Sequence, residues 1–315
     1  MADGGHVPRD WSPVGRTAAG GIPVAFGEAG EVWVRQVGAR FRAAADELGL
    51  VLGGALDGGL LSAVCAATDR EGRSVVVKSA FDPQALELEA RALIEWGTRR
   101  PESVPEVLAA AHGCLVLERV EPGTAAVPGS KGCGLDRELD AVAGLLAVVA
   151  DTVAPGWARP ADEGRGEDVT LVRQRLGAAI RAGGEVARDA GRLLGSLGSV
   201  VGELAAMRNG DRLVHGDLWP NNVLVGPDGW VMIDPWPAAG RVEADAAMWA
   251  VSAGYGQDLV ARLEGLASRL GLDREALWVH AALACISRAG VCWAYGRSPG
   301  DALPALASSL GELGW

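Results

Sequence analysis

Lysine and asparagine are both scarce in this chain of 315 residues. There are two lysines, Lys78 and Lys131, and three asparagines, Asn209, Asn221 and Asn222. Arginine therefore supplies most of the positive charge, and the net charge at pH 7 is still −11. Phosphate backbones repel a surface of this sign, which argues against a general nucleic-acid binder or a protein that binds acidic membranes. Because the two residue types are rare, each of their positions carries information.

The cysteines form neither a metal motif nor a disulfide framework. Their number, five, is odd and there is no C-x-x-C pair, so we expect reduced thiols in a cytosolic protein. The N-terminus lacks a basic segment followed by an apolar run, so no secretory signal is predicted and a cytoplasmic location is favoured. The apolar stretch at residues 276–296 carries His280 and Arg288 near its middle. It therefore predicts a core helix and not a membrane span.

The first third of the chain predicts an irregular arm followed by a small mixed domain. Residues 1–30 are rich in Gly, Pro and Ala with little periodicity, and we expect an irregular arm there. Apolar residues spaced by three and four predict a helix over residues 32–48. Two β-prone runs, 62–67 and 74–77, flank a D-R-E-G turn and predict a hairpin. Asp82 and Pro83 then open a second predicted helix that runs to about Trp96.

A Gly- and Pro-rich segment after residue 120 marks a predicted domain boundary. The rest of the chain reads mostly as helices, interrupted once by residues 215–234. The sequence therefore predicts an α+β protein, with a mostly β domain over residues 31–120 and a mostly helical domain over residues 121–315.

The segment H-G-D-L-W-P-N-N carries the strongest signal for chemistry. Two β-prone runs follow it, 223–225 and 230–233, joined by a G-P-D-G turn. Asp217 and Asn222 precede this hairpin and Asp234 follows it, so all three are expected to meet at its mouth. One carboxylate and one amide suit Mg²⁺, which also takes phosphate oxygens, and Asp217 remains free to accept a hydroxyl proton. Each residue alone is more often a turn or cap residue, but the joint pattern favours the catalytic interpretation.

The spacing H-G-D-x-x-x-x-N, followed twelve residues later by Asp234, resembles the catalytic loop and metal-binding Asp of the protein-kinase-like fold. With Gly after the His and Pro after the last Asp, it is similar to the aminoglycoside phosphotransferase family. The segment I-D-P-W-P-A-A-G is similar to the streptomycin and hydroxyurea kinases of that family. The resemblance implies a bilobal fold with a β-rich N-lobe and a mostly helical C-lobe. It also implies transfer of the γ-phosphoryl group of ATP, with Mg²⁺, to a hydroxyl.

The resemblance gives each motif residue a role. Asp217 matches the catalytic base, and His215 matches the histidine that holds the loop. Asn222 and Asp234 match the magnesium ligands.

In the N-lobe, Lys78 matches the strand lysine that contacts the α- and β-phosphates. It is the last residue of the run V-V-V-K. A lysine that ends a buried strand is costly unless it is paired. Glu89 on the following helix is the expected partner, and Glu87 is the alternative, because the two do not share one helical face.

Further nucleotide contacts are implied at two segments. The Gly-rich stretch that ends at Ser62 should cover the phosphates, although it departs from a strict G-x-G-x-x-G. The segment L-E-R-V, with Glu118 and Val120, falls at the interlobe hinge that binds adenine through backbone groups.

The expected acceptor is a cationic small molecule that bears a hydroxyl, with an aminoglycoside antibiotic favoured. No Ser, Thr or Tyr lies between Asp234 and Ser252 and no A-P-E follows, which argues against a regulated protein kinase. Candidate acceptor ligands are Glu243, Asp245 and Asp258, although Asp245 equally fits a brace for the catalytic loop.

Several alternatives remain open from the sequence. Within the same fold, a ketosamine or sugar kinase and a natural-product biosynthetic kinase use similar motifs. A catalytically silent binding module is the alternative of another class, and the complete set of motif residues argues against it. The sequence does not choose between ATP and GTP, or between a monomer and a homodimer.

Overall fold

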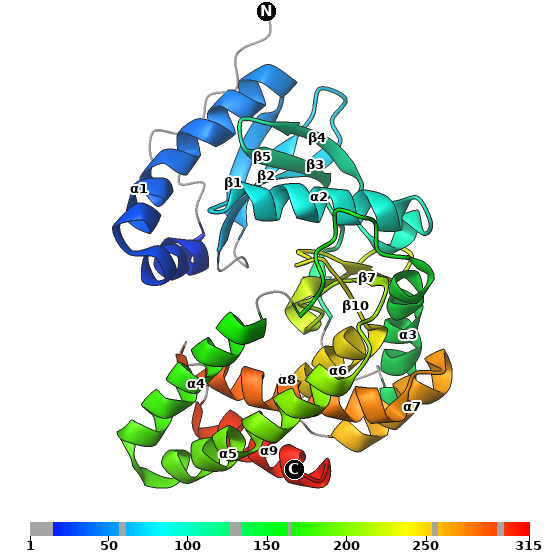
Figure 1. The fold of residues 1–315 in the computed structure, drawn as a ribbon. Helices are drawn as coiled ribbons and strands as arrows, with labels where there is room; N and C mark the ends of the chain where they lie inside the picture. The colour runs from blue at the N-terminus through cyan, green and yellow to red at the C-terminus, as the bar shows by residue number, and fades with distance from the viewer. Residues whose placement is uncertain (1–14, 57–60, 127–133, 163–164, 254–257, 295–298) are drawn as a thin grey trace, which may run out of the picture. The chain divides into compact units, whose positions relative to one another are not determined.

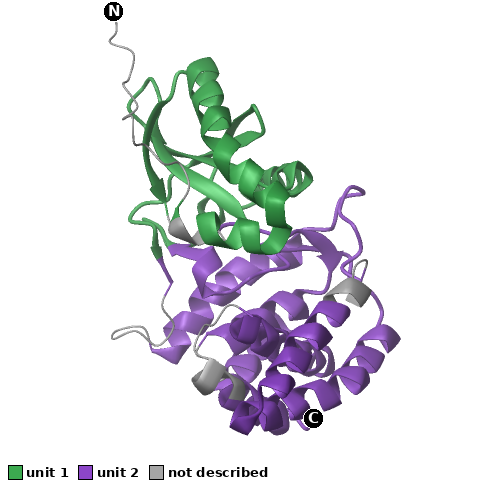
Figure 2. Cartoon of the chain, turned by 90° about the vertical axis from the view of Figure 1, so that its left-hand side faces the viewer, with its two compact units in different colours: residues 1–124, 225–231 green, residues 125–224, 232–315 purple. Residues whose placement is uncertain are grey.

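The computed structural model describes residues 15–56, 61–126, 134–162, 165–253, 258–294 and 299–315 (Figure 1). The chain divides into two compact units (Figure 2). Unit 1 comprises residues 1–124 and 225–231, and unit 2 comprises residues 125–224 and 232–315. The assignment of residues 31–120 and 121–315 as nucleotide and acceptor lobes stays a prediction.

Unit 1 contains a five-stranded antiparallel sheet in the order β1-β2-β3-β5-β4. Its strands are β1 (Val51–Leu56), β2 (Ser62–Thr68), β3 (Ser74–Ala80), β4 (Val107–Ala111) and β5 (Cys114–Glu118). The predicted β2–β3 hairpin is confirmed. Its turn is closed by the side chain of Asp69, whose Oδ1 accepts hydrogen bonds from the backbone N–H groups of Glu71 and Arg73, both at 2.9 Å.

Helix α1 spans Arg16–Leu48 and lies along this sheet (Figure 1). The irregular arm predicted for residues 1–30 is therefore wrong from Arg16 onward, and residues 1–14 lie outside the described residues. Gly27 interrupts the helical backbone with φ 56° and ψ −138°. Gly and Pro made this segment a poor helix by propensity, but burial of Ala18 and Ile22 in the core of the unit stabilises it.

The two faces of the sheet have different partners. Val75 and Val77 of β3 belong to the apolar cluster that α1 joins through Val37 and Phe41. Because side chains alternate along a strand, Lys78 lies on the opposite face. Helix α2 (Pro83–Gly97) packs there, and it begins, as predicted, with Asp82 as its N-cap.

Unit 2 is mostly helical. Its helices are α3 (Leu135–Asp151), α4 (Arg165–Ala182), α5 (Gly184–Ala206), α6 (Val242–Ser252), α7 (Leu259–Leu270), α8 (Arg274–Ala294) and α9 (Pro299–Glu312). Among the described residues, α8 alone is long and apolar enough to cross a membrane by length and composition, and 61% of that window is buried inside the protein. The predicted α+β class, with a β-rich first part and a helical second part, is confirmed.

A buried charged cluster joins three of these helices. Glu138 of α3 accepts hydrogen bonds from Nε of Arg262 in α7 at 2.9 Å and from Nε1 of Trp249 in α6 at 3.1 Å. All three side chains are almost fully buried. Removing one partner from such a cluster leaves an uncompensated buried charge, so the cluster fixes α6 against α3 and α7.

Short strands carry the motif region. β7 (Arg212–Val214) pairs with β10 (Ala238–Gly240), and β8 (Val223–Val225) lies between β6 (Thr124–Ala125) and β9 (Trp230–Met232). The hairpin predicted after residue 222 is confirmed. The motif loop therefore begins directly after β7 and returns to it through β10.

Candidate active site

In unit 1, Lys78 and Glu89 form a buried ion pair. Nζ of Lys78 donates to Oε2 of Glu89 at 2.6 Å, and the two residues are only 5% and 4% exposed. Glu87, the alternative partner, is exposed and pairs with Arg91 one turn further along α2. The choice of Glu89 is therefore confirmed. Both charges are withdrawn from water, so separating them would leave an uncompensated buried charge. The pair therefore holds the lysine ammonium in one place near the end of β3.

The other predicted nucleotide contacts lie on the same sheet. Ser62 is buried at the start of β2, opposite Ala80 of β3. Glu118 ends β5 with its side chain exposed, and the half-buried Val120 follows it. Residues 57–60 of the Gly-rich stretch lie outside the described residues. The contacts of Ser62, Glu118 and Val120 with a nucleotide stay predictions.

In unit 2, His215 is a fully buried brace of the motif loop. Its Nε2 lies 3.0 Å from the carbonyl oxygen of Ile233, so this nitrogen carries the proton and donates. Its Nδ1 then accepts the backbone N–H of Asp217 at 3.3 Å. With both ring nitrogens committed to backbone groups, the side chain orients the loop, and a catalytic role for His215 stays a prediction.

Asp245 holds the same loop from α6. Its Oδ2 accepts the backbone N–H of His215 at 2.6 Å, and its Oδ1 accepts that of Gly216 at 2.9 Å. The side chain is 1% exposed, and burial raises its pKa to about 6, although the two backbone hydrogen bonds act in the opposite direction. Asp245 therefore braces the loop, as the alternative expectation describes, and a contact with the acceptor stays a prediction.

Gly216 is required by the close approach of two chain segments. Its φ is 77°, and a Cβ at this position would lie 2.1 Å from the carbonyl oxygen of Trp236. The backbone N–H of Trp236 donates to the carbonyl oxygen of His215 at 2.8 Å. Only glycine fits both the backbone conformation and the gap, so the loop and the segment after Asp234 lie directly against each other.

Asp217 and Asn222 meet as the spacing predicts. Nδ2 of Asn222 donates to the backbone oxygen and to Oδ2 of Asp217, both at 2.9 Å. The backbone N–H of Ile233 donates to the carbonyl oxygen of Asn222 at 2.9 Å, which brings the chain just before Asp234 beside it. The three polar residues of the motif therefore share one site.

The pKa of Asp217 is raised to about 7. Burial is the largest cause, followed by the negative charge of Asp234, while the positive charge of Arg288 and the hydrogen bond from Asn222 act against it. A carboxylate with a pKa near the working pH is suited to general base catalysis, because it can take up and release a proton.

Asn222 and Asp234 have the donor chemistry that a hard cation needs. The amide nitrogen of Asn222 is committed to Asp217, which leaves its oxygen available to a cation. Asp234 adds a carboxylate from a residue in the left-handed region, with φ 57°. In the described parts of the chain, no three His, Cys, Asp or Glu side chains gather into a group that could hold a metal. A magnesium ion would therefore depend on these two residues and on substrate oxygens.

Glu243 and Asp258 differ in their availability for an acceptor. Glu243 is 8% exposed, and its carboxylate accepts the backbone N–H of Asp273 and contacts Arg241. Its carboxylate therefore has partners inside the protein, and a contact with the acceptor stays a prediction. Asp258 is exposed at the N-cap of α7 and makes no capping hydrogen bond, so its role stays a prediction.

Three residues around the loop were not singled out from the sequence. Trp236 is 62% exposed directly after the Asp-Pro pair. The guanidinium carbon of Arg288 lies 4.4 Å from the ring centroid of Trp219. Trp219 was visible within the motif, and Arg288 was visible as a charge inside an apolar run, but only the fold brings those two together.

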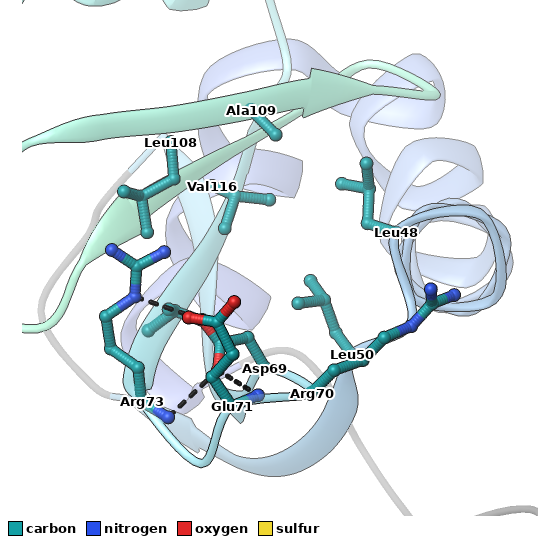
Figure 3. Close-up of a pocket in the computed structure, with 10 residues that line it drawn as sticks. Leu48, Leu50, Asp69, Arg70, Glu71, Arg73, Leu108, Ala109 and Val116 are labelled. Carbon is teal, nitrogen blue, oxygen red and sulfur yellow. Dashed lines mark hydrogen bonds and ion pairs between the residues drawn. The ribbon is translucent and has the colours of Figure 1, made fainter.

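A cavity of about 250 Å³ lies within unit 1 (Figure 3). It is lined by Leu48, Leu50 and Leu108 together with Val75, and the charged side chains of the β2–β3 turn lie at its rim. Val75 lies on the α1 face of the sheet, whereas Lys78 lies on the other face. This cavity is therefore not the predicted nucleotide site.

Residues 54–239 match the phosphotransferase enzyme family, APH, and this range contains both the Lys78–Glu89 pair and the motif loop. The chain belongs to this family. It is therefore an enzyme, a phosphotransferase, as its motif residues predict.

Two named relatives extend over most of the chain. One is a streptomycin 6-kinase of Streptomyces glaucescens, which is 29% identical over 79% of this chain and 81% of its own length. The other is a hydroxyurea phosphotransferase of Kitasatospora aureofaciens, 30% identical over 79% of this chain and 71% of its own. A choline kinase structure from Streptococcus pneumoniae is 13% identical with a TM-score of 0.57, and the match covers 88% of this chain and 99% of that one. This likeness shows a kinase-like fold.

Replacing Asp245 with Asn should destabilise the protein by about 2–3 kcal/mol, because one buried backbone N–H of the loop would lose its acceptor and face the new amide donor. Denaturant unfolding measures this change. Glu275→Gln, at an exposed position in the first turn of α8, is the matched control and should have little effect. Equal stability of the two variants would show that Asp245 does not brace the loop.

Proposed function

We propose that this chain transfers the γ-phosphoryl group of ATP to a hydroxyl of a small molecule, with Asp217 as the catalytic base. The observation that carries the proposal is the position of Asp217. It lies in a loop braced by His215 and Asp245, with Asn222 as its hydrogen-bond partner and Asp234 near enough to raise its pKa. A turn or cap residue needs none of these neighbours.

In the proposed reaction, the Asp217 carboxylate takes the proton of the acceptor hydroxyl as that oxygen attacks the γ-phosphorus. The bond from the γ-phosphorus to the bridging oxygen breaks, ADP leaves, and Asp217 later releases the proton to solvent. Such transfers depend mainly on positioning and charge stabilisation. Mg²⁺, when bound, supplies charge neutralisation at the phosphates, and Asn222 and Asp234 would hold it. Lys78, fixed by Glu89, contacts the α- and β-phosphates.

The proposed acceptor is an aminoglycoside or a related cationic antibiotic, and phosphorylating it would give resistance. The streptomycin 6-kinase relative and the net charge of −11 support this choice. Glu243 and Asp245 both have partners inside unit 2. Among the three predicted acceptor carboxylates, Asp258 alone is exposed and could bind a cationic acceptor directly. The hydroxyurea phosphotransferase relative favours a second candidate, a small neutral acceptor with a hydroxyl on nitrogen. A cytoplasmic location would suit either.

An acceptor screen by mass spectrometry tests the proposal. The purified protein is incubated with ATP and Mg²⁺ and with streptomycin, hydroxyurea, a ketosamine or a simple sugar in separate reactions. We expect streptomycin to gain one phosphoryl group. Its KM should rise with salt, because exposed charges are screened over ~8 Å at physiological ionic strength.

The variant Asp258→Asn tests whether the acceptor is bound by a local carboxylate or only attracted by the net charge of the protein. It should raise the KM of the cationic acceptor and leave the KM of ATP unchanged, while Glu275→Gln removes one exposed charge elsewhere and should change neither. A preference for hydroxyurea or the sugar would contradict the cationic acceptor. ATP hydrolysis with no phosphorylated acceptor would contradict the transfer itself.

A further inference from the structure

Helix α8 carries a charged side chain at a place where its neighbours are apolar. Cys285, Ile286 and Ala289 are all buried, and Arg288 itself is half-buried between them. A guanidinium that is partly withdrawn from water costs free energy unless other groups compensate for it. The compensation must come from whatever Arg288 faces.

The guanidinium of Arg288 faces the motif loop. It lies over the ring of Trp219, with 4.4 Å from its central carbon to the ring centroid. Its Nε is buried and has no hydrogen-bond partner among the described residues. The cation–π contact holds the group in place, but it leaves the buried Nε–H without an acceptor among the described residues.

The guanidinium of Arg288 lies beside the part of the motif loop that carries the catalytic residues. Trp219 lies two residues after Asp217 and directly before the short helix η2 (Pro220–Asn222), which carries Asn222. Arg288 therefore lies beside the loop that carries both Asp217 and Asn222. Asp217 nevertheless takes its side-chain hydrogen bond from Asn222. The positive charge is therefore close to the catalytic base without being neutralised by it.

We propose that Arg288 is a catalytic residue that donates hydrogen bonds to the oxygens of the phosphoryl group during its transfer, with Trp219 as the platform that orients it. This inference rests on the proposed function. In phosphoryl transfer, negative charge is spread over three equatorial oxygens, and an arginine supplied within the same chain can stabilise it. The planar guanidinium matches such oxygens with two parallel donors.

The charges nearby favour this ligand over a cationic acceptor group. Asp217 and Asp234 are two carboxylates, and each ionised carboxylate repels a phosphoryl group that passes beside it. A cation placed beside Arg288 would be repelled, whereas a phosphoryl group passing next to Asp217 would meet one positive charge from the protein. Arg288 thus reduces the repulsion between the incoming anion and the base.

Steady-state kinetics of three variants test the proposal. Arg288→Met keeps the length and removes the charge, Arg288→Lys keeps the charge and removes the planar fork, and Arg274→Met removes an exposed charge from the same helix. We expect kcat to fall by about 10²–10³-fold in Arg288→Met, with a smaller loss in Arg288→Lys. The KM values for ATP and acceptor should not change, since the interaction belongs to the transition state. Arg274→Met should match the wild type.

Chemical rescue separates a catalytic role from a packing role. Added guanidinium ion, below the concentration that unfolds the protein, should restore part of kcat in Arg288→Ala and none in Asp217→Asn. Unchanged kcat in Arg288→Met would overturn the proposal. A rise in the acceptor KM alone would also overturn it and assign Arg288 to acceptor binding. Equal losses in Arg288→Met and Arg288→Lys, together with a lower unfolding midpoint in both and no rescue, would assign it to packing. A wild-type protein that phosphorylates no acceptor would overturn the proposed function instead.

Discussion

Replacing Asp217 with Asn should reduce kcat by about 10²–10⁴-fold, the usual contribution of a positioned general base. The binding of MgATP should remain nearly intact. Asn has the same shape, and its side-chain oxygen can still accept the hydrogen bond that Nδ2 of Asn222 donates at 2.9 Å. What the variant lacks is a group that can take the acceptor proton. Initial rates of acceptor phosphorylation and calorimetry with MgATP measure the two properties separately.

Asp228→Asn provides the matched control, because Asp228 is an exposed turn residue between β8 and β9. That variant should keep the wild-type kcat. In the wild type, kcat divided by the acceptor KM should fall on the acid side, since the pKa of Asp217 is raised to about 7 and the base acts only when ionised. A kcat for Asp217→Asn close to that of Asp228→Asn would remove Asp217 from the mechanism.

Replacing Asp234 should damage nucleotide binding as well as turnover. The proposed metal site has one carboxylate and one amide oxygen, so losing the carboxylate leaves too little negative charge to hold Mg²⁺. Because a bound metal supplies several kcal/mol of charge stabilisation, kcat should fall by about 10²-fold or more. Calorimetry with ATP in the presence and absence of Mg²⁺ should show that the variant gains little affinity from the metal.

The choice of substitution matters at this position. Asp234 has φ 57°, a conformation that Asn tolerates better than Ala. Asp234→Asn therefore removes the charge with little backbone strain, and Asp234→Ala removes the charge and adds strain. Loss of the magnesium effect in both variants would support a role as ligand. A wild-type affinity for MgATP in Asp234→Asn would exclude that role.

The motif loop could be predicted from the sequence because its contacts are local. Asp217 and Asn222 are five residues apart, and the hairpin returns Asp234 to them through a turn of recognisable composition. The Lys78–Glu89 pair was predictable for another reason. A lysine at the end of a buried strand requires a carboxylate, and the next helix offers few.

The remaining parts of the site depend on contacts between distant residues. Asp245 lies thirty residues after His215, and nothing in its local sequence distinguishes a loop brace from an acceptor ligand. Arg288 reaches Trp219 only because α8 packs beside the motif region. The first turns of α1 were missed for a similar reason, since Ile22 is buried in a cluster that also contains strand residues such as Val75 and Val77.

The central claim is that this protein forms a phosphate ester on a hydroxyl at the expense of ATP. Phosphorus NMR of the product made by the wild-type protein, with ATP, Mg²⁺ and the acceptor that gains mass in the screen, tests it most directly. We predict the signal of a phosphate monoester on an acceptor oxygen, formed in equal amount with ADP and absent when Asp217→Asn replaces the wild type. Inorganic phosphate as the only product, or phosphate bound to an acceptor nitrogen, would contradict the account.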